Sequence, residues 1–367
     1  MYLKDLVDIQ MGQSPDSKFY NYDEIGLPFY QGKADFGRIN PTPKIWCSKP
    51  KKEAKPNDIL ISVRAPVGDL NINNEQSCIG RGLAAITCRS DVDMMYLYYY
   101  LKYLKPQLKH ISTGSTFESI NRTQLENLII DYKTYSEQIK ISNILQVVER
   151  EIEVKENLLR LYDLLIKSRF VEMFGDPNAS RTKYKLVPIH TVTDCMVPGR
   201  DKPKSFTGEI PWITINDLNI NGYTNKSKLG LGLTIDEVKE VNRKCVPQGS
   251  VLMSCVGNLG LCSIASVDVV INQQLHSYQC NEFINNLYLM YYLSFKNTYM
   301  NKIASSTTVL YMNKNACNNI PVLLPPIELQ ISFAKYLNRI NKLKSDVQKS
   351  IDETQLLMDS LMQEYFG

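Results

Sequence analysis

The chain has 367 residues, of which 44% are hydrophobic and 22% are charged, and its formal net charge is +4. At about 100–200 residues per domain, this length predicts two or three globular domains, while the small net charge means that any nucleic-acid surface must be local. Nine cysteines without a CxxC pair and only three histidines argue against a zinc site, and no run approaches the roughly 20 apolar residues that cross a bilayer.

Residues 1–135 are predicted to form a mixed α/β head. The first residues, MYLKDLVDIQ, lack the charged segment and apolar core of a signal peptide, so we expect a cytoplasmic protein with reduced cysteines. Turn signals from Gly, Pro and Asn then separate short apolar runs such as DILISV at Asp58–Val63, which are typical of strands. The stretch YLYYYLKYL from Tyr96 is predicted to be a helix whose tyrosines pack in a core.

The second half of the chain repeats the first. YLYYYL at Tyr96–Leu101 returns as YLMYYL at Tyr288–Leu293, 192 residues later. At the same offset, SVRAPVG at Ser62–Gly68 aligns with SCVGNLG at Ser254–Gly260. A self-match at fixed spacing is the signature of a repeated structural unit, so the chain is predicted to contain one unit twice.

Residues 136–175 are predicted to form one long helix, because no glycine or proline interrupts them before Gly175. About 38 residues at 1.5 Å each make a helix of roughly 57 Å. Its apolar residues recur every seven positions, at Leu145, Ile152, Leu159 and Ile166, with Val148 and Tyr162 on the adjoining seam.

The stretch GDPNAS at Gly175–Ser180 ends this helix, since glycine favours the residue after a helix and proline cannot continue one. Residues 176–327 are predicted to be a linker and the second head. PPIELQ at Pro325–Gln330 begins the second long helix, over residues 328–367. That helix carries its own apolar seam at Leu337, Ile340, Val347, Ile351, Met358 and Leu361.

The two long helices are predicted to pair with each other. Neither can bury its apolar stripe alone, although Lys155, Arg169, Lys344 and Thr354 interrupt the seams. The sequence therefore predicts an α+β fold, with two repeated heads joined by two long antiparallel coiled-coil helices and related by a pseudo-two-fold axis.

The sequence contains no recognisable catalytic motif. There is no GxxxxGK[ST] phosphate loop, and the only Pro-Pro, in LPPI at Leu324–Ile327, lacks the flanks of an amino-methyltransferase motif. The nuclease-like triplets at Glu53–Lys55 and Glu153–Lys155 lack a well-spaced Pro-Asp before them. Two alternatives stay open: a fused nuclease or methyltransferase with unrecognisable motifs, and a coiled-coil adaptor that does not bind DNA.

Four phrases carry a resemblance to a known family. They are MGQSPDSKFYNYDEIGLPFYQGKADFG at Met11–Gly37, PNDILISVRAPVGDL at Pro56–Leu70, IGRGLAAI at Ile79–Ile86 and TGSTFESINRTQLENL at Thr113–Leu128. In their order and duplication, over essentially the whole chain, they resemble the specificity subunit of a type I restriction–modification system.

The resemblance implies a non-catalytic subunit that reads DNA. Each head would be a target-recognition domain for one half of a bipartite target in double-stranded DNA, and the helices would set the spacer between the half-sites. The expected partners are two methyltransferase subunits and the restriction subunits. S-adenosylmethionine and ATP are expected on those partners, with no cofactor, metal or catalytic residue on this chain.

Candidate DNA contacts follow from the residue types in the predicted loops. Arginine can make bidentate bonds to guanine, which favours Arg64 and Arg81 in the first head. The other candidates there are Gln31, Lys33, Asp35, Ser115, Thr116, Asn121 and Arg122. Those of the second head are Thr214, Asn216, Asp217, Asn258, Gln273, Gln274, Thr307, Thr308, Asn313 and Lys314. Because SCVGNLG lacks the arginine of SVRAPVG, an asymmetric target is predicted.

Overall fold

The computed structural model describes residues 1–112, 118–179, 182–199, 201–306 and 309–367. These residues form two compact units. Unit 1 comprises Met1–Asn157 and Val347–Gly367, and unit 2 comprises Leu158–Asp346. Each of the two long helices therefore supplies residues to both units.

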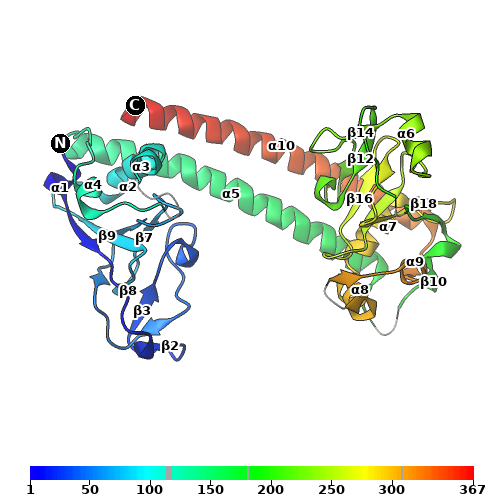
Figure 1. The fold of residues 1–367 in the computed structure, drawn as a ribbon, viewed down its shortest axis with the longest axis horizontal. Coiled ribbons are helices and arrows are strands. Elements are labelled where there is room, and N and C mark those ends of the chain that lie inside the picture. Colours follow the sequence, from blue (N-terminus) through cyan, green and yellow to red (C-terminus); the bar gives the residue numbers. More distant parts are fainter. Residues whose placement is uncertain (113–117, 180–181, 200, 307–308) are drawn as a thin grey trace. The chain divides into compact units, whose positions relative to one another are not determined.

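Unit 1 contains two sheets (Figure 1). The first is antiparallel, in the order β1 (Val7–Met11), β9 (Leu83–Cys88), β6 (Ile59–Ser62) and β7 (Leu70–Ile72). The second has the order β2 (Tyr20–Asn21), β4 (Trp46–Cys47), β3 (Leu27–Tyr30), β8 (Ser77–Ile79) and β5 (Glu53–Ala54), with β3 and β8 parallel.

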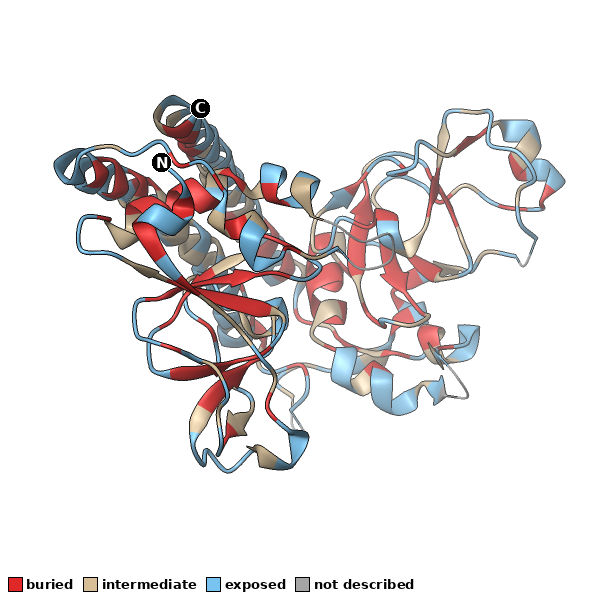
Figure 2. Cartoon of the chain, turned by 60° about the vertical axis from the view of Figure 1, so that its left-hand side comes forward, coloured by how far each residue is buried: buried red, intermediate tan, exposed pale blue. Residues whose placement is uncertain are grey.

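Strand β6 supplies both faces of its sheet with apolar side chains. Ile59 and Ile61 belong to the core cluster under the helices, whereas Leu60 packs with Tyr30 and Ile79 of the second sheet. Successive side chains of a strand point to opposite faces, so a continuous apolar run such as ILIS is required where both faces are covered. Figure 2 shows buried residues along these strands.

The remaining elements of unit 1 are short helices on one side of the first sheet and two 3₁₀ turns. They are α1 (Leu3–Leu6), α2 (Met94–Tyr103), α3 (Lys105–Ile111), α4 (Arg122–Glu126), η1 (Ser17–Phe19) and η2 (Lys33–Asp35). The tyrosines of α2 are core residues, as predicted: Tyr96 and Tyr99 are fully buried. The Tyr96 and Tyr100 rings pack against Phe366 at centroid distances of 5.5 and 4.9 Å.

Unit 2 repeats this plan. One sheet has the order β11 (Thr193–Met196), β18 (Leu275–Cys280), β15 (Val251–Ser254), β16 (Cys262–Ala265) and β13 (Tyr223–Thr224). Another has the order β14 (Gly232–Leu233), β12 (Ile210–Ile213) and β17 (Val270–Ile271). Two further pairs are β10 (Leu186–Pro188) with β21 (Pro321–Leu323), and β19 (Ser305–Ser306) with β20 (Leu310–Tyr311).

The helical elements of unit 2 are η3 (Ile189–Thr191), η4 (Ile215–Asp217), α6 (Ile235–Glu240), α7 (Asn286–Ser294), α8 (Asn297–Ile303) and α9 (Lys314–Asn318). Most of them have counterparts in unit 1, whereas α6 has none. The 192-residue offset holds to the residue for several of them: the bounds of β9, α3 and α4 reappear as those of β18, α8 and α9. The predicted repeat is confirmed.

The long helices α5 (Tyr135–Phe174) and α10 (Ile327–Phe366) obey the same offset. Near its start, each buries a glutamine that holds it to its head. Gln138 Oε1 accepts a 2.8 Å hydrogen bond from Asp93 N, the N-cap of α2. Gln330 Oε1 accepts the equivalent 2.8 Å bond from Asn285 N, the N-cap of α7.

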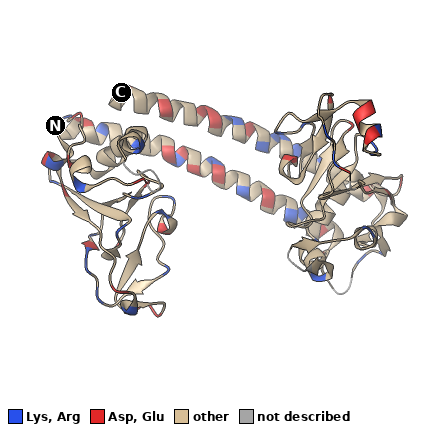
Figure 3. Cartoon of the chain, in the orientation of Figure 1, with Lys and Arg blue, Asp and Glu red and all other residues tan. Residues whose placement is uncertain are grey.

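Each unit holds an antiparallel pair of helix segments. In unit 1 the first half of α5 packs with the last turns of α10, and in unit 2 the last half of α5 packs with the first turns of α10. Lysine, arginine and acidic residues recur along both helices (Figure 3). The α+β class, the two repeated heads and the antiparallel long helices are therefore confirmed.

Candidate nucleic-acid interface

In unit 1, loops at the ends of several strands are joined by backbone hydrogen bonds. Gly80 N donates to Tyr30 O at 2.8 Å, and Val63 N donates to Gly82 O at 2.9 Å. Ile120 N then donates to Val63 O at 2.9 Å. We call this assembly the first loop cluster; it consists of Gly12–Ser14, Gln31–Lys33, Val63–Ala65, Gly80–Gly82 and Glu118–Ile120.

Glycine allows these loops to approach closely. A Cβ atom at Gly82 would lie 2.3 Å from Gln31 O, and one at Gly12 would lie 2.2 Å from Gly80 O. Both neighbours are backbone atoms that cannot rotate away, so a side chain at either glycine would force the loops apart. The glycines of the GRG turn thereby hold Arg81 close to the turn that carries Gln31.

The first loop cluster displays several of the predicted contact residues. Gln31, Arg64 and Arg81 are exposed, and the Arg64 guanidinium has no ion-pair or hydrogen-bond partner among the described residues. Lys33 is different, because its Nζ lies 3.0 Å from Asp69 Oδ2. Burial acts to raise the pKa of Asp69, but Lys105 and Lys33 outweigh it and hold this pKa below 3.8.

Three other predicted residues of this head have structural bonds. Asp35 Oδ2 accepts from Gln31 N at 2.7 Å and from Gly32 N at 3.3 Å, so it closes its own turn. Asn121 caps α4 by accepting from Gln124 N at 2.9 Å, and the neighbouring Arg122 pairs with Glu126 at 2.6 Å. Ser115 and Thr116 lie outside the described residues.

Unit 2 builds the same frame with equivalent bonds, displaced by 192 residues except at Ile213, which stands 183 residues after its counterpart Tyr30. Cys255 N donates to Gln274 O at 2.8 Å, Asn272 N to Ile213 O at 2.9 Å, and Met312 N to Cys255 O at 3.0 Å. We call this the second loop cluster; it consists of Thr214–Asp217, Cys255–Asn258, Asn272–Gln274 and Leu310–Asn313. The backbone frame of the loops is therefore repeated even where the sequence is not.

The side chains of the second loop cluster are mostly neutral. Asn216, Asn258 and Gln273 are exposed, and Thr214 and Gln274 are half-buried. Asn313 caps α9 through Ala316 N at 2.9 Å, and Lys314 beside it is exposed. Thr307 and Thr308 lie outside the described residues.

Asp217 is buried and holds its own loop together. It accepts hydrogen bonds from Thr214 N at 2.8 Å, Thr214 Oγ1 at 2.7 Å and Lys228 N at 2.7 Å. Burial acts to raise the pKa of Asp217, yet these hydrogen bonds outweigh it and lower the pKa from its usual value. Because its oxygens are occupied by these bonds, the Asp217 side chain serves to position Thr214 and Asn216.

The residues predicted to pair the long helices are all at least partly covered. Leu145, Val148, Ile152, Ile166, Leu337, Ile340 and Met358 are buried, and Leu159, Tyr162, Val347, Ile351 and Leu361 are half-buried. Several also pack on the heads: Leu145 and Val148 share a core cluster with the α2 tyrosines, and Leu337 shares one with those of α7. The seams thus attach each head as well as the opposite helix.

The polar residues that interrupt the seams have partners. Lys155 Nζ donates to Thr354 Oγ1 at 2.7 Å in unit 1, and Lys344 Nζ lies 2.6 Å from Asp163 Oδ1 in unit 2. Arg169 lies over the Tyr336 ring at 5.9 Å in unit 2. These pairs join the two helices within each unit.

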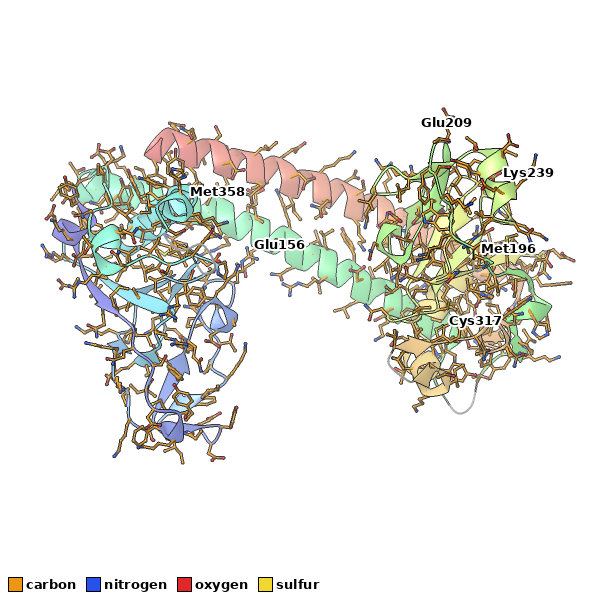
Figure 4. All side chains as sticks on the ribbon, viewed as in Figure 1. Glu156, Met196, Glu209, Lys239, Cys317 and Met358 are labelled. Atoms are coloured by element: carbon orange, nitrogen blue, oxygen red, sulfur yellow. The ribbon has the colours of Figure 1, made fainter. Side chains whose placement is uncertain are left out.

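A hollow of about 760 Å³ in unit 1 lies among α2, α3, α5 and α10. Glu156 and Met358, which are labelled in Figure 4, both line it. Two of its acidic residues are paired within the protein: Glu149 lies 2.8 Å from Lys102 Nζ, and Glu156 lies 2.5 Å from Arg38. These ion pairs attach α5 to the first head. In the loop clusters, by contrast, several candidate side chains are exposed.

Sequence reasoning did not select Ser14 or Tyr311. Ser14 Oγ accepts from Arg81 N at 3.3 Å, and Tyr311 faces Val256 across an isolated antiparallel bridge. Tyr311 could have been found from the 192-residue offset, which aligns it with Ser119 beside the predicted loop of the first head. Ser14 lies within the phrase that begins MGQSPDSKF, but its residue type gave no reason to select it.

Comparison with protein families gives a match in both halves of the chain. The model of the type I restriction modification DNA specificity domain matches residues 1–160 and 193–354. The chain belongs to this DNA specificity family. Each of the two matches contains one head and most of the long helix that follows it, which agrees with the repeat.

Relatives of this DNA specificity chain match over part of its length. The predicted specificity subunit of the type I restriction enzyme MjaX from Methanocaldococcus jannaschii is 45% identical over 148 residues, which are 40% of this chain and 35% of that protein. The MjaIX specificity subunit from the same organism is 27% identical over 185 residues, 47% of this chain and 43% of that protein. The alignments thus span less than half the length of these relatives.

A solved structure resembles the DNA specificity chain along its whole length. It is the S subunit of a type I restriction-modification system from M. genitalium, with 15% identity and a TM-score of 0.58. The alignment covers 100% of this chain and 95% of that one, so the fold is shared where the sequence is not.

Two features are absent from the described part of this DNA specificity chain. No three His, Cys, Asp or Glu side chains in it are grouped to hold a metal ion. No helix in it is long and apolar enough to cross a membrane.

Proposed function

We propose that the chain is the DNA sequence-recognition subunit of a type I restriction–modification complex. Each head reads one half of a bipartite, asymmetric target through its loop cluster, and the chain itself carries out no chemistry. The observation that carries the proposal is the repeated frame: the same backbone bonds present Arg64 and Arg81 in unit 1 but Val256 and Gln273 in unit 2. A constant frame with different side chains is suited to reading two different sequences.

The long helices set the spacer between the half-sites in this proposal. Both are 40 residues long without internal glycine or proline, which makes each about 60 Å in length. Within each unit the seams pack the helix segments against the head and against each other. A rigid connection is what a fixed spacer requires, because a flexible linker would allow many separations.

The helices also bind the methyltransferase subunits, one copy at each of two equivalent places. Leu164 and Leu165 of α5 are exposed, and so are Leu356 and Leu357 of α10, 192 residues later. Exposed leucine pairs are uncommon on a charged helix face, and covering them by a partner is favourable. Two identical apolar pairs suit two identical partner subunits, with the restriction subunits added to that core.

The chemistry belongs to these partners. S-adenosylmethionine would bind to the methyltransferase subunits and ATP to the restriction subunits, while this chain selects the double-stranded DNA. The main-chain frame and the exposed amide and guanidinium groups of the loop clusters match the donors and acceptors of base edges. The proposed role is therefore selection and assembly.

Genome-wide mapping of methylated adenines in cells that express the complete system tests this proposal. We expect one bipartite sequence with two different half-sites and a constant spacer. A strain without this chain serves as the control and should lack these methylation sites. Methylation that is unchanged in that strain, or sites that form a perfect palindrome, would contradict the proposal.

A further inference from the structure

The two loop clusters present a pair of facing residues at matching positions. In unit 1 an isolated antiparallel bridge joins Arg64 to Ser119, and in unit 2 the equivalent bridge joins Val256 to Tyr311. Residues that face each other across such a bridge project to the same side, with Cβ atoms about 5 Å apart. Each cluster therefore offers a two-residue surface at the same point of the same frame.

The chemistry of these two surfaces is opposite. Arg64 is an exposed cation beside the small hydroxyl of Ser119. Val256 is half-buried and Tyr311 is 46% exposed, and the neighbouring Val309 is 53% exposed. The first surface donates hydrogen bonds, whereas the second is largely apolar.

The apolar surface is held in place before any ligand arrives. Val256 packs against the core of unit 2, which fixes its side chain from behind. Gly257 N donates to Leu310 O at 2.9 Å, on the residue before Tyr311, and Met312 N donates to Cys255 O at 3.0 Å, on the residue after it. A surface that is already ordered loses little entropy when it binds, so even a small contact can contribute to selectivity.

Only one base offers an apolar group in the major groove. Thymine carries a 5-methyl group there, whereas guanine offers two acceptors that suit an arginine. We propose that Val256 and Tyr311 read the methyl group of a thymine in the half-site of the second head, at the place where the first head uses Arg64 on a guanine. This inference rests on the proposed function, because it assumes that the loop clusters contact base edges.

The test uses the full chain assembled with the methyltransferase subunits of its own system, and a DNA duplex that carries the mapped methylation site. In a series of duplexes, each thymine of the second half-site is replaced in turn by deoxyuridine, which lacks only the 5-methyl group. We expect one replacement to weaken binding about fourfold, the effect of one buried methyl or methylene group.

Two variants assign that effect to this surface. The Val256→Ala complex should discriminate less than the wild type between the parent and the deoxyuridine duplex, because one of the two contacting side chains is shortened. The Val256→Ile complex keeps an apolar side chain and should keep the discrimination. Deoxyuridine placed in the first half-site is the matched DNA control, and its effect should be the same in all three proteins.

The possible failures can be told apart. If the wild-type complex binds its target no better than a scrambled duplex, the proposed function fails. If the preference for the target is intact but no deoxyuridine in the second half-site changes affinity, the thymine contact is overturned, and this result needs no variant. A Val256→Ala complex that retains the full wild-type sensitivity overturns it as well.

Discussion

Lys155 Nζ on helix α5 donates a 2.7 Å hydrogen bond to Thr354 Oγ1 on helix α10, inside the seam of unit 1. Thr354 is buried and in turn donates to Ser350 O at 2.7 Å. Lys155 also lies 2.6 Å from Glu151 Oε1 of its own helix. Two polar residues that break the heptad pattern thus satisfy each other, and a single polar pair of this kind can select one register of a coiled coil.

Thr354→Val should lower the free energy of unfolding by about 1 kcal/mol, because the half-buried ammonium group of Lys155 loses an acceptor. The double variant Lys155→Met, Thr354→Val should regain part of that loss, since apolar replacement of both partners leaves no unsatisfied group. Urea unfolding of the full chain measures both values. Gln355→Ala, on the exposed side of α10, is the control, and a double variant that is no more stable than Thr354→Val would contradict the pairing.

His276 should make unit 2 less stable as the pH falls from 6.5 towards 4. Burial lowers the pKa of His276 to about 4, with Nε2 lying 3.1 Å from Asn318 Oδ1. In the unfolded chain the imidazole of His276 is protonated below about pH 6.5, whereas in the folded chain it stays neutral down to about pH 4. The free energy of unfolding therefore falls across this window, by at most about 3 kcal/mol.

Unfolding of the His276→Gln variant across this pH range checks the effect. The variant should show a flatter pH dependence between pH 6.5 and 4, whatever its stability at neutral pH. Equal slopes for the His276→Gln variant and the wild type would contradict this prediction.

Gly82→Ala should disturb the first loop cluster. The added Cβ would lie 2.3 Å from Gln31 O, so the loops must separate, at an expected cost of about 1–3 kcal/mol. Because the displaced loops carry Gln31 and Arg81, we expect the Gly82→Ala variant also to reduce methylation of the target. Gly32→Ala is the control in the same cluster, because its Cβ would meet nothing within 4 Å, and it should change stability by less than about 0.5 kcal/mol.

Arg64→Ala should relax the specificity of the first half-site at one position and cost about 1–3 kcal/mol there. Arg122→Ala, at the start of α4, should instead weaken binding to all sequences alike and reduce the salt dependence by about one unit, as expected for a phosphate contact. Methylation-site sequencing and binding at several salt concentrations separate the two. A uniform loss in Arg64→Ala would reassign that residue to the phosphate backbone.

Replacement of Leu164 and Leu165 by aspartate should remove one methyltransferase subunit from the complex, and replacement of Leu356 and Leu357 should remove the other. Aspartate on a face that a partner covers leaves an unpaired buried charge. Native mass spectrometry of the assembled complex counts the subunits. Aspartate at Glu353, which is already exposed and acidic, is the control, and a full complex in both leucine variants would show that the partner binds elsewhere.

The sequence by itself determined the repeat, the two long helices and their seams. These follow from short-range properties: absence of glycine and proline keeps a helix continuous, and the spacing of Leu145, Ile152 and Ile166 sets which face is buried. The 192-residue offset could be recognised in the sequence because both copies keep the same residue types at positions with the same buried contacts. Gln138 and Gln330 are an example.

Only the tertiary structure decided which polar residues are free to contact a ligand. Residue type alone made Lys33, Asp35 and Asp217 candidates beside Arg64, yet Asp69 pairs with Lys33, and backbone N–H groups occupy both aspartates. The bridge from Val256 to Tyr311 likewise joins residues 55 positions apart. Hydrogen bonds and ion pairs between distant segments depend on how the chain folds back on itself, and no local sequence pattern encodes that.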